Sequence, residues 1–334
     1  MEKSTIFSKI CFWILILFFG NFSFAQDEDD IAVIERTNIK DTVYVGAFVN
    51  SFYDFDIAER SFKTDLWLWF LYTREGLDLS DKIEIANTKD YSINNVSLDK
   101  TKGFQWLGMR LKAEVMKDWD VRNYPFDKQS LDVVIESQEF DTSAITLLAD
   151  SKNSSIDEQF HFKDWVLNKF KLTNFYRIYN TSFGDQELTG KSVYPAIKLN
   201  IEITRKYSWL ILFKLITGVI IAFMIASSVF FINPLNTDPR FGLCVGGLFA
   251  AVGNKYIVEG TIPATTSNTL LDNIHNTTFI FIFIIIVLSI ISLKMREIDT
   301  EKSVLRSQKI DKIGFFACAT IYFSLICSFI YYAY

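Results

Sequence analysis

The chain has 334 residues, a formal net charge of −5 at pH 7, and a composition that is 50% hydrophobic and 16% aromatic. It contains four cysteines and two histidines, and all four cysteines lie in apolar runs, so we expect no disulfide framework. With two histidines in the chain and no cysteine in residues 26–206, the sequence does not favour a His/Cys metal site or a histidine-based nucleophile system. The sequence also has no glycine-rich phosphate loop. It therefore predicts that the protein is not an enzyme and that it holds no metal or other cofactor.

The first residues have the pattern of a secretory signal peptide. Lys3 and Lys9 precede a short apolar run at residues 11–20, and a Ser-Phe-Ala site follows at residues 23–25. The alternative is an uncleaved membrane anchor, which needs about 20 apolar residues, more than this run provides. We therefore predict a signal peptide at residues 1–25, with the chain that follows it exported across the bacterial inner membrane.

Residues 26–206 show the two-residue alternation of β-strands. In residues 197–203, apolar side chains alternate with polar ones, which is typical of a strand with one face in water. Residues 64–72 and 43–49 are rich in aromatic and β-branched side chains, which favour strands. Many short strands separated by turn-rich segments predict an all-β extracellular sandwich.

From residue 207 the pattern changes to apolar segments long enough to cross a membrane as helices. Residues 294–312 include six basic side chains, whereas residues 260–276 include none. Because basic loops stay in the cytoplasm, we predict a cytoplasmic loop at 294–312 and a periplasmic location for residues 26–206. Residues 207–334 are therefore expected to form a four-helix transmembrane domain, multi-pass, in the bacterial inner (plasma) membrane. The predicted spans are residues 209–232, 241–262, 277–293 and 313–334.

The second apolar segment carries a glycine-rich face. At about 100° per residue, the residues that fall within one narrow arc are Asp238, Gly242, Gly246, Phe249, Gly253, Tyr256 and Gly260. Glycine is unfavourable in a helix interior by about 1 kcal/mol relative to alanine, so a stripe of glycines indicates a constraint. Two interpretations remain open from these residues alone: close packing of neighbouring helices, or the lining of a pore.

A short motif links these observations to a known family. Residues 122–131 read Arg-Asn-Tyr-Pro-Phe-Asp-Lys-Gln-Ser-Leu, and residues 258–263 read Val-Glu-Gly-Thr-Ile-Pro. With the exported strand region and the four spans, the chain resembles the prokaryotic branch of the pentameric ligand-gated ion channels, the Cys-loop receptor superfamily, here without the loop cysteines. The resemblance implies a homopentamer of identical subunits in membrane lipid, opened by a small-molecule or ion ligand. No nucleic acid is expected as a partner.

The resemblance also implies which residues line the pore. In the family the second span runs from a basic residue at its cytoplasmic start to an acidic residue shortly before a proline, which here match Arg240 and Glu259. Phe249 stands at the level of a hydrophobic gate that closes by dewetting. Acidic rings favour cations, and residues 27–206, with 31 acidic and 23 basic side chains, would concentrate cations near the pore mouth. The predicted pore and selectivity residues are Asp238, Arg240, Gly242, Gly246, Phe249, Gly253, Tyr256 and Glu259.

Some features depart from the family's pattern. Glycines stand where the inner half of the pore usually has serine or threonine, and the first span has no proline. Lys255 lies within the second span, where a charge is costly unless paired, and Glu259 is its nearest candidate partner. These departures leave a second interpretation open, a non-conducting membrane receptor or scaffold with the same fold. A small transporter is disfavoured, because the four spans contain no inverted repeat.

The gating interface is also predicted by the resemblance. In the family the proline-containing loop, the turn after the first strand and a basic residue before the first span meet above the pore. The matching residues here are Asp56, Pro125, Phe126, Asp127, Arg205 and Pro263. Arginine can hold carboxylates in bidentate geometry, so Arg205 is predicted to pair with these acids. Taken alone, Asp56 fits a solvated surface charge equally well.

A ligand site is expected between subunits, under a hairpin at residues 179–194. Aromatic faces there could hold an amine by cation–π contact. The residues that the resemblance suggests are Phe160, Phe162, Tyr179, Phe183 and Tyr194. For each ring, ordinary packing inside the sandwich is the alternative, and gating by protons or calcium is equally open.

Overall fold

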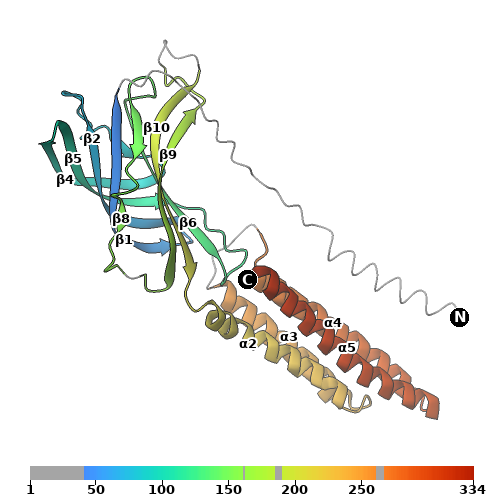
Figure 1. Ribbon diagram of the computed structural model, residues 1–334. Coiled ribbons are helices and arrows are strands. Elements are labelled where there is room, and N and C mark those ends of the chain that lie inside the picture. The colour runs from blue at the N-terminus through green and yellow to red at the C-terminus, as the bar shows by residue number, and fades with distance from the viewer. Residues whose placement is uncertain (1–40, 161, 185–189, 261–266) are drawn as a thin grey trace. The chain divides into compact units, whose positions relative to one another are not determined.

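Strands and helices occupy separate stretches of the chain. The computed structural model describes residues 41–160, 162–184, 190–260 and 267–334. Within these residues, ten strands lie between Thr42 and Arg205, and four long helices lie between Ser208 and Ala333 (Figure 1). The predicted fold class, an all-β sandwich followed by a four-helix transmembrane bundle, is confirmed. The predicted signal peptide at residues 1–25 lies outside the described residues.

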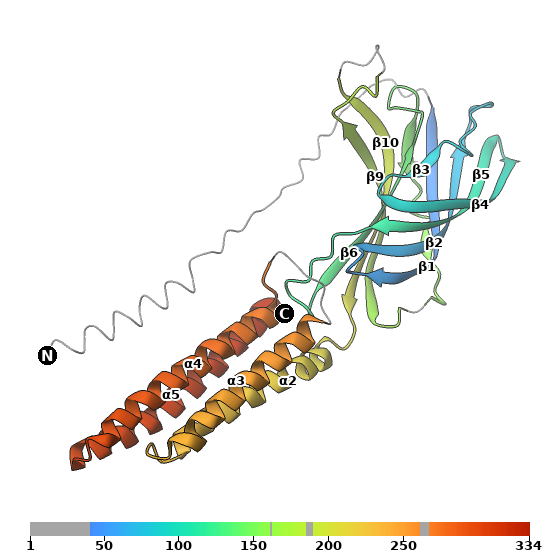
Figure 2. The ribbon, with the colours of Figure 1, turned by 180° about the vertical axis from the view of Figure 1, so that it is seen from behind.

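The strands form two sheets of a sandwich (Figure 1 and, from behind, Figure 2). The order in the first sheet is β4-β5-β2-β1-β7, with β8 beside β1, and the order in the second is β3-β6-β10-β9. Strand β10 pairs antiparallel with both β6 and β9, so side chains from these three strands share one face. The strands are β1 Thr42–Asp56, β2 Ser61–Tyr72, β3 Ile83–Ile85, β4 Thr88–Thr101, β5 Phe104–Met116, β6 Lys128–Ser137, β7 Thr146–Ala149, β8 Ser155–Ile156, β9 Trp165–Tyr179 and β10 Ser192–Arg205.

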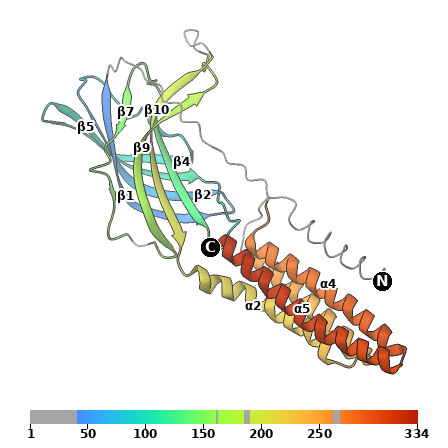
Figure 3. The same cartoon turned by 45° about the vertical axis from the view of Figure 1, so that its right-hand side comes forward.

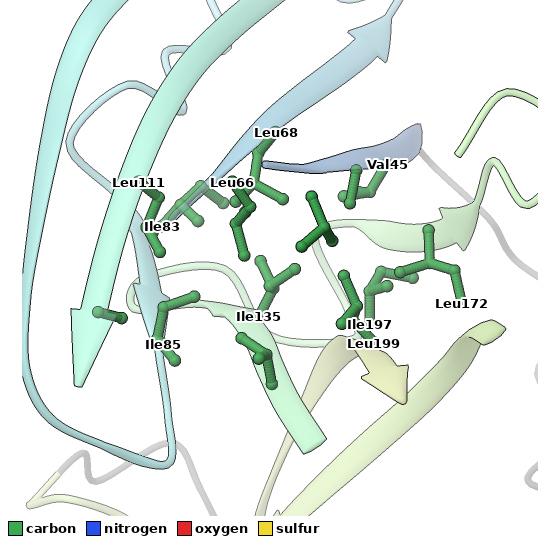
Figure 4. Packing of buried hydrophobic residues seen from close by; sticks show 14 of the residues in the cluster. Val45, Leu66, Leu68, Ile83, Ile85, Leu111, Ile135, Leu172, Ile197 and Leu199 are labelled. Atoms are coloured by element: carbon green, nitrogen blue, oxygen red, sulfur yellow. The ribbon is translucent and has the colours of Figure 1, made fainter. Parts of the chain in front are cut away.

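Alternate side chains of each sheet fill the space between the two sheets. Leu66 and Leu68 of β2 lie in one cluster with Ile135 of β6 and with Ile197 and Leu199 of β10 (Figure 4). All five side chains are at most 1% exposed. Fully burying one such side chain stabilises the fold by about 1.5–3 kcal/mol. The alternation seen in the sequence therefore sets the register and leaves the polar residues on the outer faces.

Four helices are long and apolar enough to cross a membrane, which is the arrangement of a multi-pass membrane protein. Helices α4 and α5 lie side by side (Figure 3). The rings of Phe223 in α2 and Tyr322 in α5 stack with centroids 3.8 Å apart, so the first and last helices share the same core. The helices are α2 Ser208–Ser227, followed by the 3-10 turn η1 Ser228–Phe231, then α3 Thr237–Glu259, α4 Leu270–Glu297 and α5 Glu301–Ala333.

Residues 294–312, expected as a loop, are mostly helical. Helix α4 continues to Glu297, and α5 begins at Glu301. Thr300 and Ser303 form a capping box at the start of α5, in which each hydroxyl accepts a hydrogen bond from the other residue's backbone N–H. Hydropathy detects only the part of a helix that lies in the bilayer, here from residue 313. The capping box starts α5 at Glu301, more than two turns before that residue.

Candidate functional site

One face of α3 is left uncovered by the rest of the described chain. Phe249 and Tyr256 on this face are 71% and 72% exposed, although both are large aromatic residues in an apolar helix. A Cβ added to any of the glycines at 242, 246 and 253 would meet no described atom within 4 Å. We call this the α3 face, and its exposed residues are Asp238, Gly242, Gly246, Phe249, Gly253, Tyr256 and Glu259.

Close helix packing within the chain uses other glycines. A Cβ at Gly247 of α3 would lie 2.8 Å from the carbonyl oxygen of Ala222 in α2, so glycine is needed for the two helices to approach. A Cβ at Gly314 of α5 would lie 3.1 Å from the ring of Phe230. The packing interpretation therefore applies to Gly247 and Gly314 within one chain, and not to the glycines of the α3 face.

Arg240 does not share the exposure of the α3 face. Its side chain is fully buried, with Nη2 2.5 Å from Oδ1 of Asp311 in α5. Its Nη1 also donates to the carbonyl oxygen of Ile232, at 3.1 Å. Arg240 was predicted as a pore residue, and the structure instead makes it an anchor between α3 and α5. The sequence offered one signal for this partner, a single acid at the edge of the last apolar segment.

Two polar residues of α3 that lie off the α3 face have partners inside the chain. Lys255 Nζ lies 3.5 Å from Glu259 Oε1 and 5.9 Å from the centre of the Phe279 ring. Asn254 Oδ1 lies 3.0 Å from Nε2 of His275 in α4. The charge of Lys255, which would be costly alone in a membrane, is therefore paired within its own helix.

The proline-containing loop places Asp127 against Arg205. Arg205 Nε donates to Asp127 Oδ1 at 2.6 Å, and the two side chains are 12% and 1% exposed. The second carboxylate oxygen accepts from Gln129 Nε2 at 2.8 Å. The guanidinium also lies 4.7 Å from the centre of the Tyr124 ring and 4.3 Å from that of Trp165. Both cation–π contacts stabilise the buried guanidinium. Neither ring was among the residues predicted for this site.

The same loop contacts the helices through its phenylalanine. The ring of Phe126 lies 4.9 Å from that of Trp209, at the start of α2, and 5.5 Å from that of Tyr334, after α5. The backbone N–H of Leu270, the first residue of α4, donates to the carbonyl oxygen of Arg122 at 2.8 Å. Pro125, which is buried and follows a cis peptide bond, lies between these two contacts in the sequence. The loop thus touches three helices.

Asp56, another predicted interface residue, has its contacts elsewhere. Asp56 is exposed, and its Oδ1 accepts a hydrogen bond from the backbone N–H of Glu59 at 2.8 Å, so it caps its own turn. Its backbone oxygen accepts from Trp119 Nε1 at 3.0 Å. These contacts of Asp56 do not bring it to Arg205. Pro263 lies outside the described residues.

The five predicted ligand-site aromatics form two separate groups. Tyr179, Phe183 and Tyr194 make one cluster, with ring centroids 5.3–6.3 Å apart. Phe162 belongs to a second aromatic group, in which it packs against Phe160 and Phe55. The Phe55 ring also contacts Trp165, the first residue of β9. Because β9 has 15 residues at about 3.3 Å each, its two ends lie roughly 45 Å apart. One subunit therefore offers only the hairpin group as a single site.

A strand sandwich followed by four helices that are apolar enough to cross a membrane defines a multi-pass membrane protein. Residues 79–207 match the family model of the neurotransmitter-gated ion-channel ligand binding domain. A proton-gated ion channel of Gloeobacter violaceus is 23% identical over 207 residues, which cover 61% of this chain and 54% of that channel. The alignment thus spans about half the length of this relative. The predicted resemblance to the prokaryotic pentameric ligand-gated ion channels is confirmed by both comparisons.

Proposed function

We propose that the chain is a subunit of a homopentameric ligand-gated ion channel, cation-selective, whose pore is lined by α3. The uncovered α3 face is the observation that carries this proposal. In a closed ring of identical subunits, the face that each chain leaves uncovered is available to surround the central axis. Phe249, more than two thirds exposed near the middle of this helix, is placed to close such a pore as a ring of five aromatic side chains.

The charges at the ends of α3 support cation selectivity. Asp238 and Glu259 are exposed and would form two acidic rings, of which the Asp238 ring is the less compensated, because Glu259 pairs with Lys255 at 3.5 Å. Arg240, the basic residue near the cytoplasmic end, is withdrawn from the α3 face by its pairing with Asp311. The positive charge that would oppose cations at the pore mouth is therefore neutralised inside the subunit, and we leave Arg240 out of the proposed pore lining.

Gating would pass through the loop that contains Asp127. Strand β10 ends at Arg205, two residues before α2, so a movement of β10 reaches the guanidinium that Asp127 holds. Phe126 in the same loop contacts both the start of α2 and the end of the chain. A ligand that shifts β9 and β10 thus has a connected path of contacts to the helices. Pro263, beyond the end of α3, would receive this movement.

Each segment of the chain has a role in the proposed channel. Residues 1–25 would be a signal peptide, residues 26–206 a periplasmic ligand-binding sandwich, and residues 207–334 the transmembrane domain in the lipid of the bacterial inner membrane. The hairpin aromatics Tyr179, Phe183 and Tyr194 would contribute to the ligand site. The ligand would be a small molecule or an ion; the G. violaceus relative is named as proton-gated.

Ion flux through liposomes containing the purified full chain tests this function. We expect cation flux to exceed anion flux and the Glu259→Gln variant to reduce that preference. Glu297→Gln at the end of α4 is the matched control, because Glu297 is exposed but lies away from the α3 face. Equal cation and anion flux in the parent chain would exclude cation selectivity. No flux in assembled rings under any stimulus would favour the non-conducting receptor or scaffold.

A further inference from the structure

A buried carboxylate lies on the outer side of the second sheet. Glu136 of β6 is 2% exposed. Its direct partner in β10 is the small residue Ala196, over which two side chains of β9 reach it. The Tyr179 hydroxyl donates to Glu136 Oε1 at 2.5 Å, and Arg177 Nη1 lies 3.4 Å from the same oxygen. This carboxylate therefore joins β9 to β6 across the strand between them.

A second acid stands directly opposite Glu136 on the neighbouring strand. Glu136 Oε2 is buried and has no hydrogen-bond donor among the described residues. Glu84 of β3 is the direct cross-strand partner of Glu136, with its carboxyl group in hydrogen-bonding reach. Two ionised carboxylates are both acceptors and cannot bond to each other. One proton between them would make that hydrogen bond and supply the missing donor.

The charged and titratable groups around Glu136 come from three strands. Glu84 belongs to β3, and Arg177 and Tyr179 belong to β9. On β10, Tyr194 and Lys198 flank Ala196, and the Lys198 ammonium lies 3.8 Å from Asp132 Oδ2. Among the described residues, only Arg177 places a cation against Glu136; its Nη1 donates to Oε1 at 3.4 Å, and its side chain is 31% exposed. The described surroundings thus offer one positive charge against two carboxyl groups.

We propose that Glu84 and Glu136 bind one proton between them and that this shared proton holds β3 to β6. Burial is the main cause that raises the pKa of Glu136 above its ordinary value, and the neighbouring Glu84 raises it further. Tyr179 and Arg177 act in the opposite direction. Burial and the bond to Glu136 raise the pKa of Tyr179 too, so the phenol keeps the proton that it donates.

Loss of the shared proton weakens the attachment of β3 to β6. Two ionised carboxylates directly opposite each other on neighbouring strands repel, and the burial of Glu136 strengthens the repulsion. Strand β6 pairs with β10, which ends at Arg205, the partner of Asp127. Proton binding at Glu84 and Glu136 is therefore connected to the junction with the helices. This last consequence rests on the proposed channel function, whereas the proton site itself does not.

Amide hydrogen exchange of the full chain in lipid nanodiscs tests the proton site without requiring conduction. After correction for the intrinsic rate, we expect amides at the pairing of β3 with β6, such as that of Ala86, which donates to the carbonyl oxygen of Val134 at 2.9 Å, to exchange about tenfold faster at about pH 7.5 than at about pH 5. In Glu136→Gln the amide side chain replaces the protonated carboxyl, and exchange should be slow at both pH values. Glu84→Gln is the second variant and should flatten the pH dependence in the same way.

The matched control is Glu139→Gln. Glu139 lies shortly after β6, but its side chain is 57% exposed and pairs with Lys82 at 2.6 Å. This variant should keep the pH dependence of the parent chain. Unchanged exchange in the parent chain between the two pH values, or full pH dependence in the folded Glu136→Gln and Glu84→Gln variants, would overturn the proposal. An infrared band of a protonated carboxyl group near neutral pH, absent from both variants, would support it, whether or not the protein conducts.

Discussion

The guanidinium of Arg205 and the carboxylate of Asp127 lie 2.6 Å apart in a nearly closed site, with the rings of Tyr124 and Trp165 close to the cation. Gln129 satisfies the second carboxylate oxygen. Because Arg205 ends β10 and Asp127 belongs to the loop that contacts the helices, this pair joins the two structural parts of the chain. Its geometry is that of a firm connection rather than a solvated surface contact.

Replacing Asp127 with asparagine should be strongly destabilising. The change leaves the buried Arg205 guanidinium without its counter-charge, which costs about 3–5 kcal/mol in comparable pairs. The matched control is Asp54→Asn, since Asp54 pairs with Lys63 at 2.8 Å but is 63% exposed. That substitution should leave the stability unchanged within error. Thermal unfolding of the two variants in detergent checks this, and equal stability would show that the Asp127 pair carries no more than a surface pair.

Asp311→Asn should destabilise the helical bundle in a similar way. It leaves the fully buried Arg240 without its carboxylate, at a cost of about 3–5 kcal/mol. Asp299→Asn removes an equally short but exposed pair, with Arg296 at 2.6 Å, and should have little effect. Denaturant titration of the reconstituted chain compares them. A large loss in Asp299→Asn, or none in Asp311→Asn, would contradict the role assigned to Arg240.

Neighbouring glycines of α3 should respond in opposite ways to alanine. Gly247→Ala places a methyl group against the Ala222 carbonyl and should destabilise the packing of α2 on α3. Gly246→Ala meets open space in the chain and raises helix propensity, so it should be neutral or stabilising by up to about 1 kcal/mol. It should also lower the single-channel conductance, because five added methyl groups would narrow the proposed pore. Strong destabilisation by Gly246→Ala would instead indicate packing against a neighbouring subunit.

Acid stability should depend on Asp65. Hydrogen bonds from Arg110 at 2.9 and 2.7 Å are the main cause that lowers the pKa of this carboxyl group. A lowered pKa contributes stability above the ordinary aspartate value, and that stability is lost as the pH falls through the lowered value. Glu136 acts in the opposite sense, because its raised pKa gives stability that is lost as the pH rises.

The measurement is the unfolding temperature as a function of pH. Asp65→Asn should lower it near neutral pH and flatten its fall in acid. Glu75→Gln is the control, since Glu75 is exposed and pairs with the exposed Lys100 at 2.9 Å. A parent-like acid profile in Asp65→Asn would contradict this assignment.

Local patterns in the sequence were enough for much of the fold. The two-residue alternation of strands such as β10 and the shared face of α3 follow from the periodicity of the backbone, so both could be predicted. The long-range partners could not. Asp311 is 71 residues from Arg240, and the acids at 84 and 136 meet only because β3 pairs with β6. No local sequence pattern indicates such long-range pairs. Hydropathy could not predict where α5 begins either, because the helix starts at a capping box outside the apolar segment.

Current through planar bilayers in asymmetric salt, recorded without ligand from purified pentamers of Phe249→Ala, tests the central claim most directly. Phe283→Ala is the matched control, because Phe283 of α4 is 66% exposed but lies on another helix. Our account predicts a continuous cation-selective leak in Phe249→Ala and parent-like closure in Phe283→Ala, because only the first removes the proposed gate. Silence from properly assembled Phe249→Ala pentamers would contradict a pore lined by α3 and leave the non-conducting receptor or scaffold as the better interpretation.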